Sequence, residues 1–296
     1  MADAANEVRL GLVGRGIQGS RSPSMHMQEG AAQGLRLSYV LLDLDLPSET
    51  DRDLGQVLSQ AERQGFAGLN VTYPFKQEVI LHLTDLAPDA RRLGAVNTVV
   101  LKDGRRIGHN TDWSGFAESF RRGLPDVALR HVVQLGAGGA GAAVAYALLE
   151  RGVVKLTIFD VDPRRASALA VLLCGIFGTG RAVVGTDLVE TMALADGAAN
   201  ATPVGMAKLP GTPLPVGLLR PSQWLSDVIY FPIETELLAA ARRIGCRTLD
   251  GGGMAVFQAA DAFRLFTGVE PDAERMRARF LEAVGPPTGA GSSAPA

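Results

Sequence analysis

The segment NVTYPFK, which ends at Lys76, carries a type of cation that is rare in this chain. Only four of the 29 basic residues are lysines. Arginine stays charged at any accessible pH, whereas a lysine amine can be tuned to exchange a proton. Most exposed lysines provide only solubilising charge. Because arginine supplies charge elsewhere in the chain, Lys76 raises the question of a proton-transfer role, which the rest of the sequence must decide against plain solubilisation.

A second group of polar residues lies in separate predicted loops. Asp112, in GHNTDWSG, stands where a predicted strand gives way to a helix, although Asn-Thr-Asp at this place also suits a helix N-cap. Asn97 opens a predicted strand, where asparagine is disfavoured. Ser20 and Ser22 offer two hydroxyls at a strand-to-helix turn, where a carboxylate could bind. Together with a lysine, these groups would suit one small polyhydroxy acid.

Three glycines with the spacing G-x-G-x-x-G, Gly136, Gly138 and Gly141, follow the apolar run VVQL and precede a long helical pattern. The triplet alone is weak evidence, but its place between strand and helix is what dinucleotide binding requires. The glycines allow a tight turn, close approach of a pyrophosphate, and close packing of helix on strand. The next strand ends at Asp160, 24 residues beyond Gly136. A carboxylate there would bind the ribose hydroxyls and repel a 2′-phosphate, which favours NAD over NADP.

Two further features bear on the same ligand. Arg164 and Arg165 either accept a 2′-phosphate or are solvated residues in the first turn of a helix opened by Pro163. Asn200 and Thr202, in GAANATPVGM, end a later strand, on the edge where doubly wound sheets bind ligands. They could also be plain turn formers, but the predicted dinucleotide site needs a wall there.

Short apolar strands alternate with helical patterns along the chain, which predicts an α/β fold with parallel sheets covered by helices on both faces. Ser22 is expected to cap a helix over 23–33, and a second helix is expected over 51–64. Asp103-Gly104 is a hairpin signature. We place a domain boundary after Asp112, with a mixed-sheet α/β domain before it and a dinucleotide-binding domain after it. Residues 286–296 lack apolar periodicity and are expected to be a disordered tail.

Composition excludes several classes of protein. The net charge of -2 argues against nucleic acid or an anionic membrane as the main partner. Two cysteines, Cys174 and Cys246, are too few for a disulfide framework, and with four scattered histidines they give no metal-ligand spacing. The chain shows neither a signal-peptide pattern nor a long apolar run. We expect a cytoplasmic protein, monomeric or homodimeric, that binds a small-molecule substrate and no metal.

Eight ordered motifs carry a family resemblance over nearly the whole chain. They are GLVGRGIQGSRSPSMH, LNVTYPFK, GAVNTV, GHNTDWSGF, GAGGAG, NATPVGM, DVIYFPIETELL and DGGGMAVFQAADAFRLFTG. Through them the chain resembles shikimate dehydrogenases and, more closely, the bacterial quinate/shikimate dehydrogenase branch. The resemblance implies a catalytic domain of residues 1–112 and 255–285, since the last helices return to it, and a Rossmann-like NAD(P)-binding domain of residues 113–254.

The resemblance also implies an activity and a set of site residues. The activity is reversible hydride transfer between NAD(P), with NAD favoured, and the secondary hydroxyl of shikimate, with quinate or an amino analogue as further substrates. Lys76 and Asp112 would be the catalytic pair, with the immediate proton acceptor left open. Substrate would bind to Ser20, Ser22, Thr72, Asn97, Tyr230 and Gln258. Cofactor would bind to Gly136, Ala137, Gly138, Gly139, Ala140, Gly141, Asp160, Arg165, Asn200, Thr202, Val228, Gly251 and Met254.

Three departures from the family's usual motifs bear on specificity. Gly16-Ile17-Gln18-Gly19 replaces a Pro-apolar step before the serine pair. The sequence SRSP replaces the SRTP of the quinate/shikimate branch, so Ser22 lacks a methyl group beside the carboxylate site. FDVDPRR stands where NADP-preferring members have a basic turn. Two other functions remain open: a related dehydrogenase for another cyclic or folate-like substrate, and a non-catalytic cofactor sensor.

Overall fold

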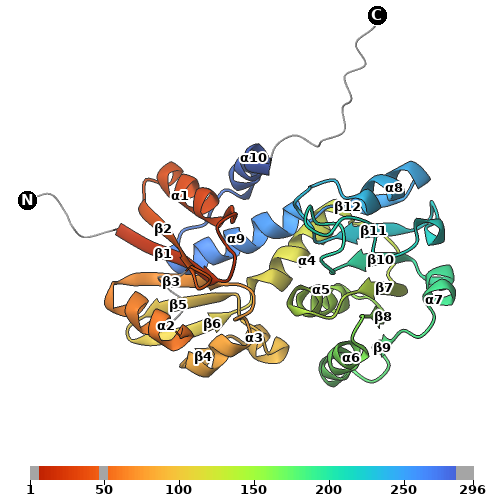
Figure 1. Cartoon of the computed structure of the whole chain (residues 1–296), viewed down its shortest axis with the longest axis horizontal. Coiled ribbons are helices and arrows are strands. Elements are labelled where there is room, and N and C mark those ends of the chain that lie inside the picture. The colour runs from red at the N-terminus through yellow and green to blue at the C-terminus, as the bar shows by residue number, and fades with distance from the viewer. Residues whose placement is uncertain (1–6, 47–52, 285–296) are drawn as a thin grey trace, which may run out of the picture. The chain divides into compact units, whose positions relative to one another are not determined.

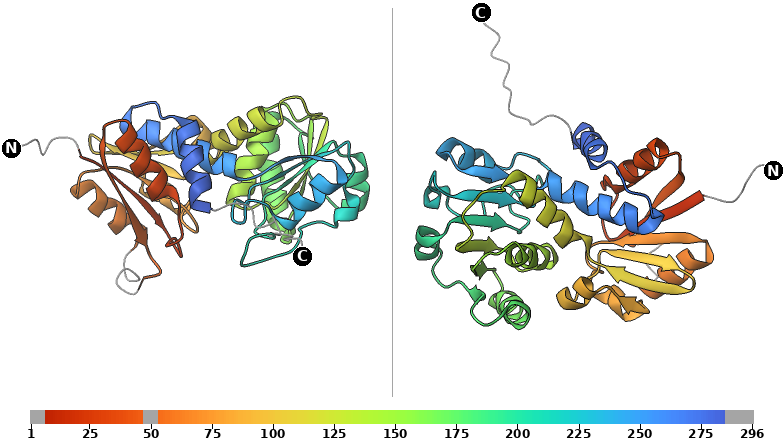
Figure 2. Two further views of the ribbon diagram at one scale, coloured as in Figure 1. Left: turned by 90° about the horizontal axis from the view of Figure 1, so that it is seen from above. Right: turned by 180° about the vertical axis from the view of Figure 1, so that it is seen from behind.

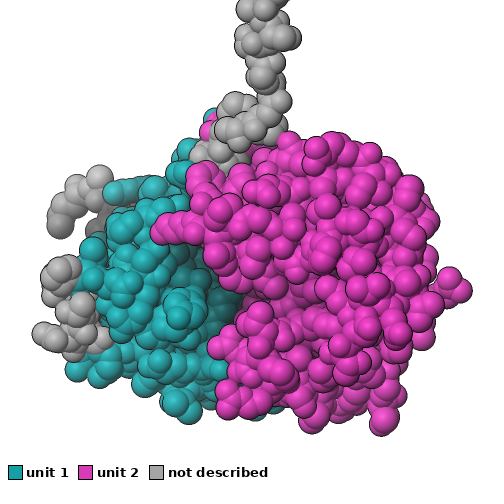
Figure 3. Space-filling model, turned by 45° about the vertical axis from the view of Figure 1, so that its right-hand side comes forward, with its two compact units in different colours: residues 1–118, 255–280 teal, residues 119–254, 281–296 magenta. Residues whose placement is uncertain are grey.

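Two six-stranded sheets, one in each of two compact units, organise the chain (Figures 1 and 3). The computed structural model describes residues 7–46 and 53–284. The first unit comprises Met1–Glu118 and Ala255–Phe280, and the second comprises Ser119–Met254 and Leu281–Ala296. The division therefore falls inside a helix, α4 (Thr111–Gly123), rather than directly after Asp112. The expected tail, 286–296, lies outside the described residues.

The first unit contains a mixed sheet, as predicted. Its strands are β1 (Glu7–Gly14), β2 (Arg36–Asp43), β3 (Phe66–Val71), β4 (Asp85–Leu86), β5 (Thr98–Lys102) and β6 (Arg105–His109), in the spatial order β2-β1-β3-β5-β6-β4. Strand β1 pairs in parallel with β2 and β3, whereas β5 is antiparallel to β3 and β6. Asp103 and Gly104 turn the β5–β6 hairpin with positive φ at both residues, as their signature predicts.

Helices cover both faces of this sheet (Figure 2). The helices are α1 (Ser22–Ala32), α2 (Leu54–Arg63), η1 (Glu78–His82), α3 (Pro88–Leu93), α9 (Gly252–Thr267) and α10 (Ala273–Val284). On one face, Val13 and Leu69 of the sheet pack with Leu58 of α2. On the other face, Leu10 packs with Phe266 of α9. The alternation of side chains along β1 thus separates two apolar cores.

The second unit contains a parallel sheet. Its strands are β7 (His131–Leu135), β8 (Lys155–Phe159), β9 (Ala182–Val184), β10 (Gly197–Asn200), β11 (Trp224–Asp227) and β12 (Arg247–Leu249), and its helices are α5 (Gly139–Glu150), α6 (Pro163–Phe177), α7 (Leu188–Leu194), η2 (Val216–Leu218) and α8 (Glu236–Ile244). The spatial order is β9-β8-β7-β10-β11-β12. In order of occurrence this is 3-2-1-4-5-6, the order of dinucleotide-binding folds, whose ligands bind where the strand order reverses. The predicted Rossmann-like fold is confirmed.

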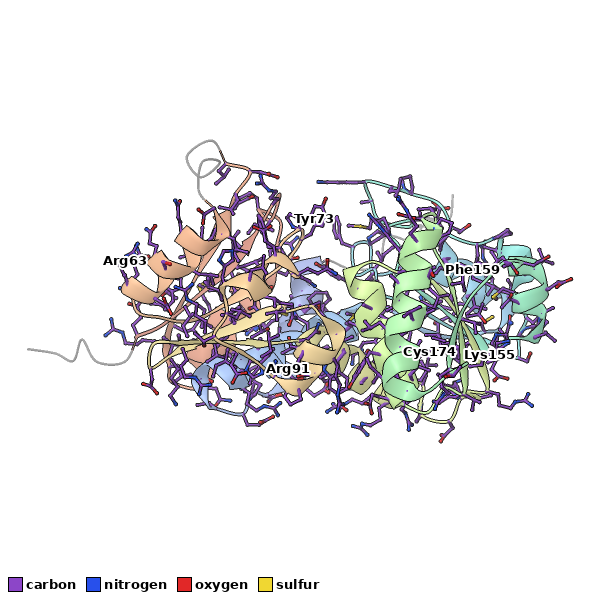
Figure 4. The ribbon with its side chains drawn as sticks, turned by 90° about the horizontal axis from the view of Figure 1, so that it is seen from below. Arg63, Tyr73, Arg91, Lys155, Phe159 and Cys174 are labelled. Atoms are coloured by element: carbon purple, nitrogen blue, oxygen red, sulfur yellow. The ribbon has the colours of Figure 1, made fainter. Side chains whose placement is uncertain are left out.

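Alternate residues of β7 show which helices lie on which face of the parallel sheet. Val133 and Leu135 pack in one core with Met192 of α7 and Leu238 of α8. Gln134, which points the opposite way, donates to the Gly141 carbonyl of α5. Helix α5 therefore covers the face opposite to α7 and α8. Figure 4 labels Lys155 and Phe159, the two ends of β8, and the Phe159 end marks the carboxyl edge of the sheet.

Two helix boundaries differ from expectation. Helix α1 begins at Ser22, so Ser22 is the first helical residue and not the N-cap, which is Arg21. The Ser22 hydroxyl lies close to the Tyr39 phenol instead. Helix α2 begins at Leu54 behind the N-cap Asp53, whose side chain accepts the Gln56 N–H, and the expected start at 51–52 lies outside the described residues. None of the helices in the described ranges has the length and apolar character needed to cross a bilayer.

Candidate active site

Lys76 and Asp112 form an ion pair in the first unit. The Lys76 Nζ donates to Asp112 Oδ2 at 2.5 Å. The two side chains are 22% and 11% exposed, so water surrounds only a small part of either group. A partly desolvated amine beside a carboxylate can exchange a proton with a hydroxyl bound next to it.

Backbone hydrogen bonds bring these two residues together from segments 36 positions apart. The Lys76 carbonyl accepts the Val96 N–H at 2.8 Å, which ties the turn after β3 to the segment before β5. Asp112 lies in the first turn of α4. The Asn110 carboxamide oxygen accepts the N–H groups of Asp112 and Trp113 at 3.1 and 3.3 Å. Asn110 therefore caps α4 and leaves the Asp112 carboxylate available to Lys76.

Asn97 orients the carboxylate of this pair. Its Nδ2 donates to Asp112 Oδ1 at 3.0 Å and to Thr111 Oγ1 at 2.9 Å, and its Oδ1 accepts the Thr111 N–H at 2.7 Å. The Gln258 amide of α9 also lies within reach, with 3.5 Å between Asn97 Nδ2 and Gln258 Oε1. The structure thus brings together four of the expected site residues, Lys76, Asp112, Asn97 and Gln258.

The serine pair and Thr72 belong to two loops that are bonded to one another. Thr72 N–H donates to Val13 O, and Arg15 N–H donates to Tyr73 O, both at 3.0 Å. The Ser20 hydroxyl accepts the Ser22 N–H at 3.3 Å at the start of α1. These bonds hold the loop after β1 beside the turn that carries Lys76.

Asp43, which the sequence did not single out, anchors the loop before the serine pair. Its buried carboxylate accepts the Gly16 and Ile17 N–H groups at 2.9 and 3.1 Å. It also accepts the Gln18 side-chain amide at 3.0 Å and the Asp45 N–H at 3.1 Å. Burial raises the pKa of Asp43, but these four donors together hold it below its usual value. The carboxylate thus fixes the Gly-Ile-Gln-Gly segment that replaces the family's Pro-apolar step.

We expect Asp43→Asn to lower the free energy of unfolding by about 1–3 kcal/mol, because an amide cannot accept from all four donors. Asp45→Asn is the matched control: Asp45 pairs with Arg15 and is 53% exposed, so its loss should cost less than about 1 kcal/mol. Urea titration of both variants measures the difference. Equal losses would show that the buried carboxylate is not an anchor.

In the second unit, the glycine turn after β7 has the geometry that a dinucleotide requires. Gly136 has φ of +98°, and a Cβ there would lie 2.6 Å from the Ala201 carbonyl oxygen. A Cβ at Gly141 would lie 2.3 Å from the Gly136 carbonyl oxygen. At Gly138, the N-cap of α5, a Cβ would meet no described atom within 4 Å. Gly136 therefore makes the tight turn, Gly141 allows close packing of the helix, and Gly138 leaves open space for a ligand. These are the three roles that the motif requires, so the residues fit a pyrophosphate.

Two polar side chains brace this turn from opposite sides. Asp160, directly after β8, accepts the Ala137 N–H at 2.7 Å and the Asp162 N–H at 2.8 Å. Gln134 is buried and donates to the carbonyls of Gly136 and Gly141 at 2.9 and 2.8 Å. Sequence reasoning missed Gln134, although a polar residue inside the apolar run VVQL was a signal. From the sequence we expected Asp160 to bind a ribose, and the structure shows that Asp160 also accepts a hydrogen bond from the glycine turn.

The other expected cofactor residues follow neighbouring strands at the carboxyl edge. Asn200 ends β10 beside Gly136, since the next residue, Ala201, donates to Leu135 O at 2.8 Å. Val228 N–H donates to Asn200 O at 3.0 Å, and Gly251 N–H donates to Ile229 O at 3.2 Å. Asn200 Oδ1 accepts a hydrogen bond from the Thr202 hydroxyl. Met254 lies in the first turn of α9. Gly139 and Ala140 are the first two residues of α5.

Asp227, which the sequence did not single out, supports the carboxyl edge of the parallel sheet. The carboxylate accepts Asn200 Nδ2 at 3.0 Å, the Ile229 N–H at 3.0 Å and the Thr235 hydroxyl at 2.8 Å. Burial raises the pKa of Asp227 to about 6, against the effect of these donors. Asp227 therefore holds Asn200 in place at the end of β10.

Three expected residues have more exposed side chains. Arg164 and Arg165 both pair with Asp162, the N-cap of α6, at 3.2 and 3.9 Å. Tyr230 belongs to the second unit, three residues after β11. Tyr73, beside Thr72, projects into solvent with 75% of its surface exposed (Figure 4).

Known proteins with similar sequences match this chain nearly from end to end. Residues 12–99 match the family described as "Shikimate dehydrogenase substrate binding domain", and residues 251–279 match "Shikimate 5'-dehydrogenase C-terminal domain". A Streptomyces avermitilis protein named shikimate dehydrogenase (NADP(+)) is 56% identical over 278 residues, 93% of this chain and 96% of its own. A Corynebacterium efficiens protein named quinate/shikimate dehydrogenase (NAD(+)) is 51% identical over 93% of this chain and 98% of its own.

A solved structure adds the three-dimensional comparison. Quinate dehydrogenase from Corynebacterium glutamicum in complex with NAD superposes with a TM-score of 0.91 at 49% identity, over 94% of this chain and all of that one.

Proposed function

We propose, because the chain belongs to the shikimate dehydrogenase family, that it catalyses the reversible oxidation of shikimate, and secondarily of quinate, by a nicotinamide dinucleotide. The observation that carries this proposal is the Lys76–Asp112 pair, held at 2.5 Å by buried amide and backbone groups in the unit that matches the substrate-binding family. A glycine turn that fits a pyrophosphate, on a sheet of dinucleotide-binding order, supports it.

In this mechanism the first unit handles the proton. Oxidation of a secondary alcohol to a ketone releases a hydride and a proton, and the dinucleotide, when bound, accepts the hydride. Lys76 and Asp112 take the hydroxyl proton as a pair, with Lys76 leading. Asn97 keeps Asp112 turned toward Lys76 through its hydrogen bond to Oδ1. In the reverse direction, the Lys76 ammonium donates a proton to the developing alkoxide.

The serine pair binds the substrate carboxylate in this proposal. Ser20 and Ser22 present hydroxyls at the start of α1, where the free N–H groups of the helix also favour an anion. Thr72 and Gln258 are proposed to bind ring hydroxyls, together with Tyr230 from the second unit. The structure supports the grouping of the first-unit residues by the hydrogen bonds described above.

Initial rates of the purified protein with shikimate and quinate, each with NAD and with NADP, test this function. We expect shikimate to give the higher kcat/KM, because Ser22 stands where the quinate/shikimate branch typically has the Thr of SRTP. Absence of turnover with all four pairs would refute the proposal and favour a cofactor sensor.

We also propose that NAD is preferred over NADP. Asp160 lies directly after β8, where a carboxylate accepts the ribose hydroxyls and repels a 2′-phosphate. Arg164 and Arg165, the cations that could attract that phosphate, are paired with Asp162. Relatives with both preferences are similar to this chain, so the preference rests on these residues.

We expect Asp160→Asn to reduce the ratio of kcat/KM with NAD to that with NADP by about tenfold, since a repulsive charge is removed. It should also raise the KM for NAD, because one of the two N–H groups that Asp160 accepts would lose its acceptor. Asp187→Asn is the control, since Asp187 caps α7 and is bonded to Glu190 N–H. An unchanged ratio in Asp160→Asn would mean that Asp160 only braces the turn.

A further inference from the structure

A continuous chain of buried polar side chains leads across the first unit's sheet to Asp112. Tyr39 of β2 donates its hydroxyl proton to Asn70 Oδ1 of β3 at 2.8 Å. Asn70 Nδ2 donates to Thr98 Oγ1 of β5 at 3.1 Å. The Thr98 hydroxyl donates to Asn97 Oδ1 at 3.2 Å. None of Tyr39, Asn70 and Thr98 is among the site residues that the sequence pointed to.

The hydrogen bonds of this chain share one direction. Each side chain accepts from the residue before it and donates to the residue after it, and the last donor, Asn97 Nδ2, gives its proton to Asp112 Oδ1 at 3.0 Å. Donors aligned in this way polarise one another in a low-dielectric interior, so they strengthen the last bond. The bond that is strengthened fixes the carboxylate of the proton-transfer pair.

The far end of the chain meets the expected carboxylate-binding loop. The Ser22 hydroxyl lies close to the Tyr39 phenol. Burial raises the pKa of Tyr39, so the phenol remains a neutral donor. The His26 ring of α1 packs on the Tyr39 ring with 5.0 Å between centroids, and neither ring nitrogen of His26 bonds to another described residue. The His26 ring therefore packs against the Tyr39 ring without offering its hydroxyl another hydrogen-bond partner, so the phenol stays directed at Asn70.

A common face of the sheet explains how these residues meet. Tyr39 pairs with Leu10 of β1, and Asn70 pairs with Leu12 of the same strand. Leu10 and Leu12 point to the same face, since they are two positions apart. The Tyr39 side chain therefore crosses β1 to reach Asn70, and Thr98 stands opposite Asn70 in the antiparallel pair. All three side chains are buried.

We propose that Tyr39, Asn70 and Thr98 are positioning residues that orient Asn97 and Asp112 for proton transfer. The inference rests on the proposed function, because it concerns the same proton-transfer pair. Under this inference, the buried residues of the strands affect kcat and not only the binding of substrate or cofactor.

Thr98 offers the sharpest test, because two of its variants separate the hydroxyl from the methyl group. Thr98→Val keeps the shape but removes the hydroxyl, and Thr98→Ser keeps the hydroxyl. We expect kcat with shikimate to fall about tenfold in Thr98→Val, to return to within about twofold of the wild type in Thr98→Ser, and the KM for the dinucleotide to stay unchanged in both. Equal kcat in the two variants would overturn the inference.

Tyr39→Phe tests the head of the chain. The ring and its contact with His26 remain, so we expect a folded protein whose kcat falls about fivefold to tenfold. Tyr146→Phe is the control, since Tyr146 is a buried tyrosine of the second unit that packs on Phe177, and its kcat should not change. An unchanged kcat in Tyr39→Phe, with the thermal midpoint lowered, would show a structural role and overturn the inference.

If the wild-type protein shows no turnover, the proposed function itself is refuted. If the wild type turns over but the variants keep its kcat, only the positioning role is refuted.

Discussion

Lys76→Ala should lower kcat/KM by at least about 10³-fold while leaving the dissociation constant for NAD within about twofold of the wild type. In the proposed reverse reaction the Lys76 amine donates a proton to the alkoxide, while the Asp112 carboxylate accepts hydrogen bonds from Lys76 and Asn97. The proposed dinucleotide-binding residues belong to the second unit, whereas Lys76 belongs to the first, so we do not expect the substitution to change them. Steady-state rates and NAD titration by fluorescence measure the two quantities.

A second substitution separates proton transfer from charge. Lys76→Arg keeps a cation beside Asp112 but cannot exchange its proton at neutral pH, so we expect a loss nearly as large as in Lys76→Ala. Lys102→Ala is the matched control, because Lys102 is an exposed lysine at the end of β5 in the same unit. If Lys76→Arg kept more than about a tenth of the activity, the role of Lys76 would be electrostatic. Equal loss of turnover and NAD binding in Lys76→Ala would mean that the residue is structural.

Local signals allowed much of the fold and part of the site to be predicted from sequence. The strand, glycine turn and helix around Gly136 follow from backbone constraints that act within a few residues, and so does the hairpin at Asp103-Gly104. Lys76 and Asp112 could be paired through their residue types and the family resemblance, and the structure brings them to hydrogen-bonding distance.

The supporting polar residues could not be predicted, because their roles depend on register between distant strands. Tyr39 stands in LSYVLLD and Asn70 in GLNVT, and neither pattern reveals which face of its strand is buried. Only their pairing with Leu10 and Leu12 of β1 places both on one buried face. The expected capping role of Ser22 was wrong, because α1 already begins at Ser22 and Arg21 occupies the N-cap position.

The helix that carries Ser22 is itself held by an ion pair between a buried carboxylate and a partly exposed guanidinium, and this pair should contribute strongly to the stability of the first unit. Arg275 of α10 donates from Nε and Nη2 to the two carboxylate oxygens of Glu29 in α1, both at 2.7 Å. The Glu29 side chain has no exposed surface, and its Oε1 also accepts the Asp272 N–H and the Gln33 amide. Burial raises the pKa of Glu29, but Arg275 and these donors together keep it below its usual value.

Arg275→Ala should lower the free energy of unfolding by about 3–5 kcal/mol at pH 7, because it leaves a carboxylate buried without a cation. Arg264→Ala is the control: Arg264 pairs with Asp261 and Glu270 but is half exposed, so its loss should cost less than about 1 kcal/mol. Adding Glu29→Gln to Arg275→Ala should recover at least half of the loss, since the buried charge is then removed. Urea titration compares the four proteins.

The dependence of the free energy of unfolding on pH tests whether Arg275 acts by neutralising Glu29. In the wild type the pKa of Glu29 is lowered on folding, so its contribution is present above the pKa of the unfolded chain and is lost as the pH falls through the folded value. In Arg275→Ala the uncompensated carboxylate should instead take up a proton on folding, so that variant should gain stability relative to the wild type as the pH falls from 7 toward 4. The two stability curves should therefore converge in acid. A constant gap between them would mean that Arg275 stabilises α10 by packing and not by neutralising Glu29.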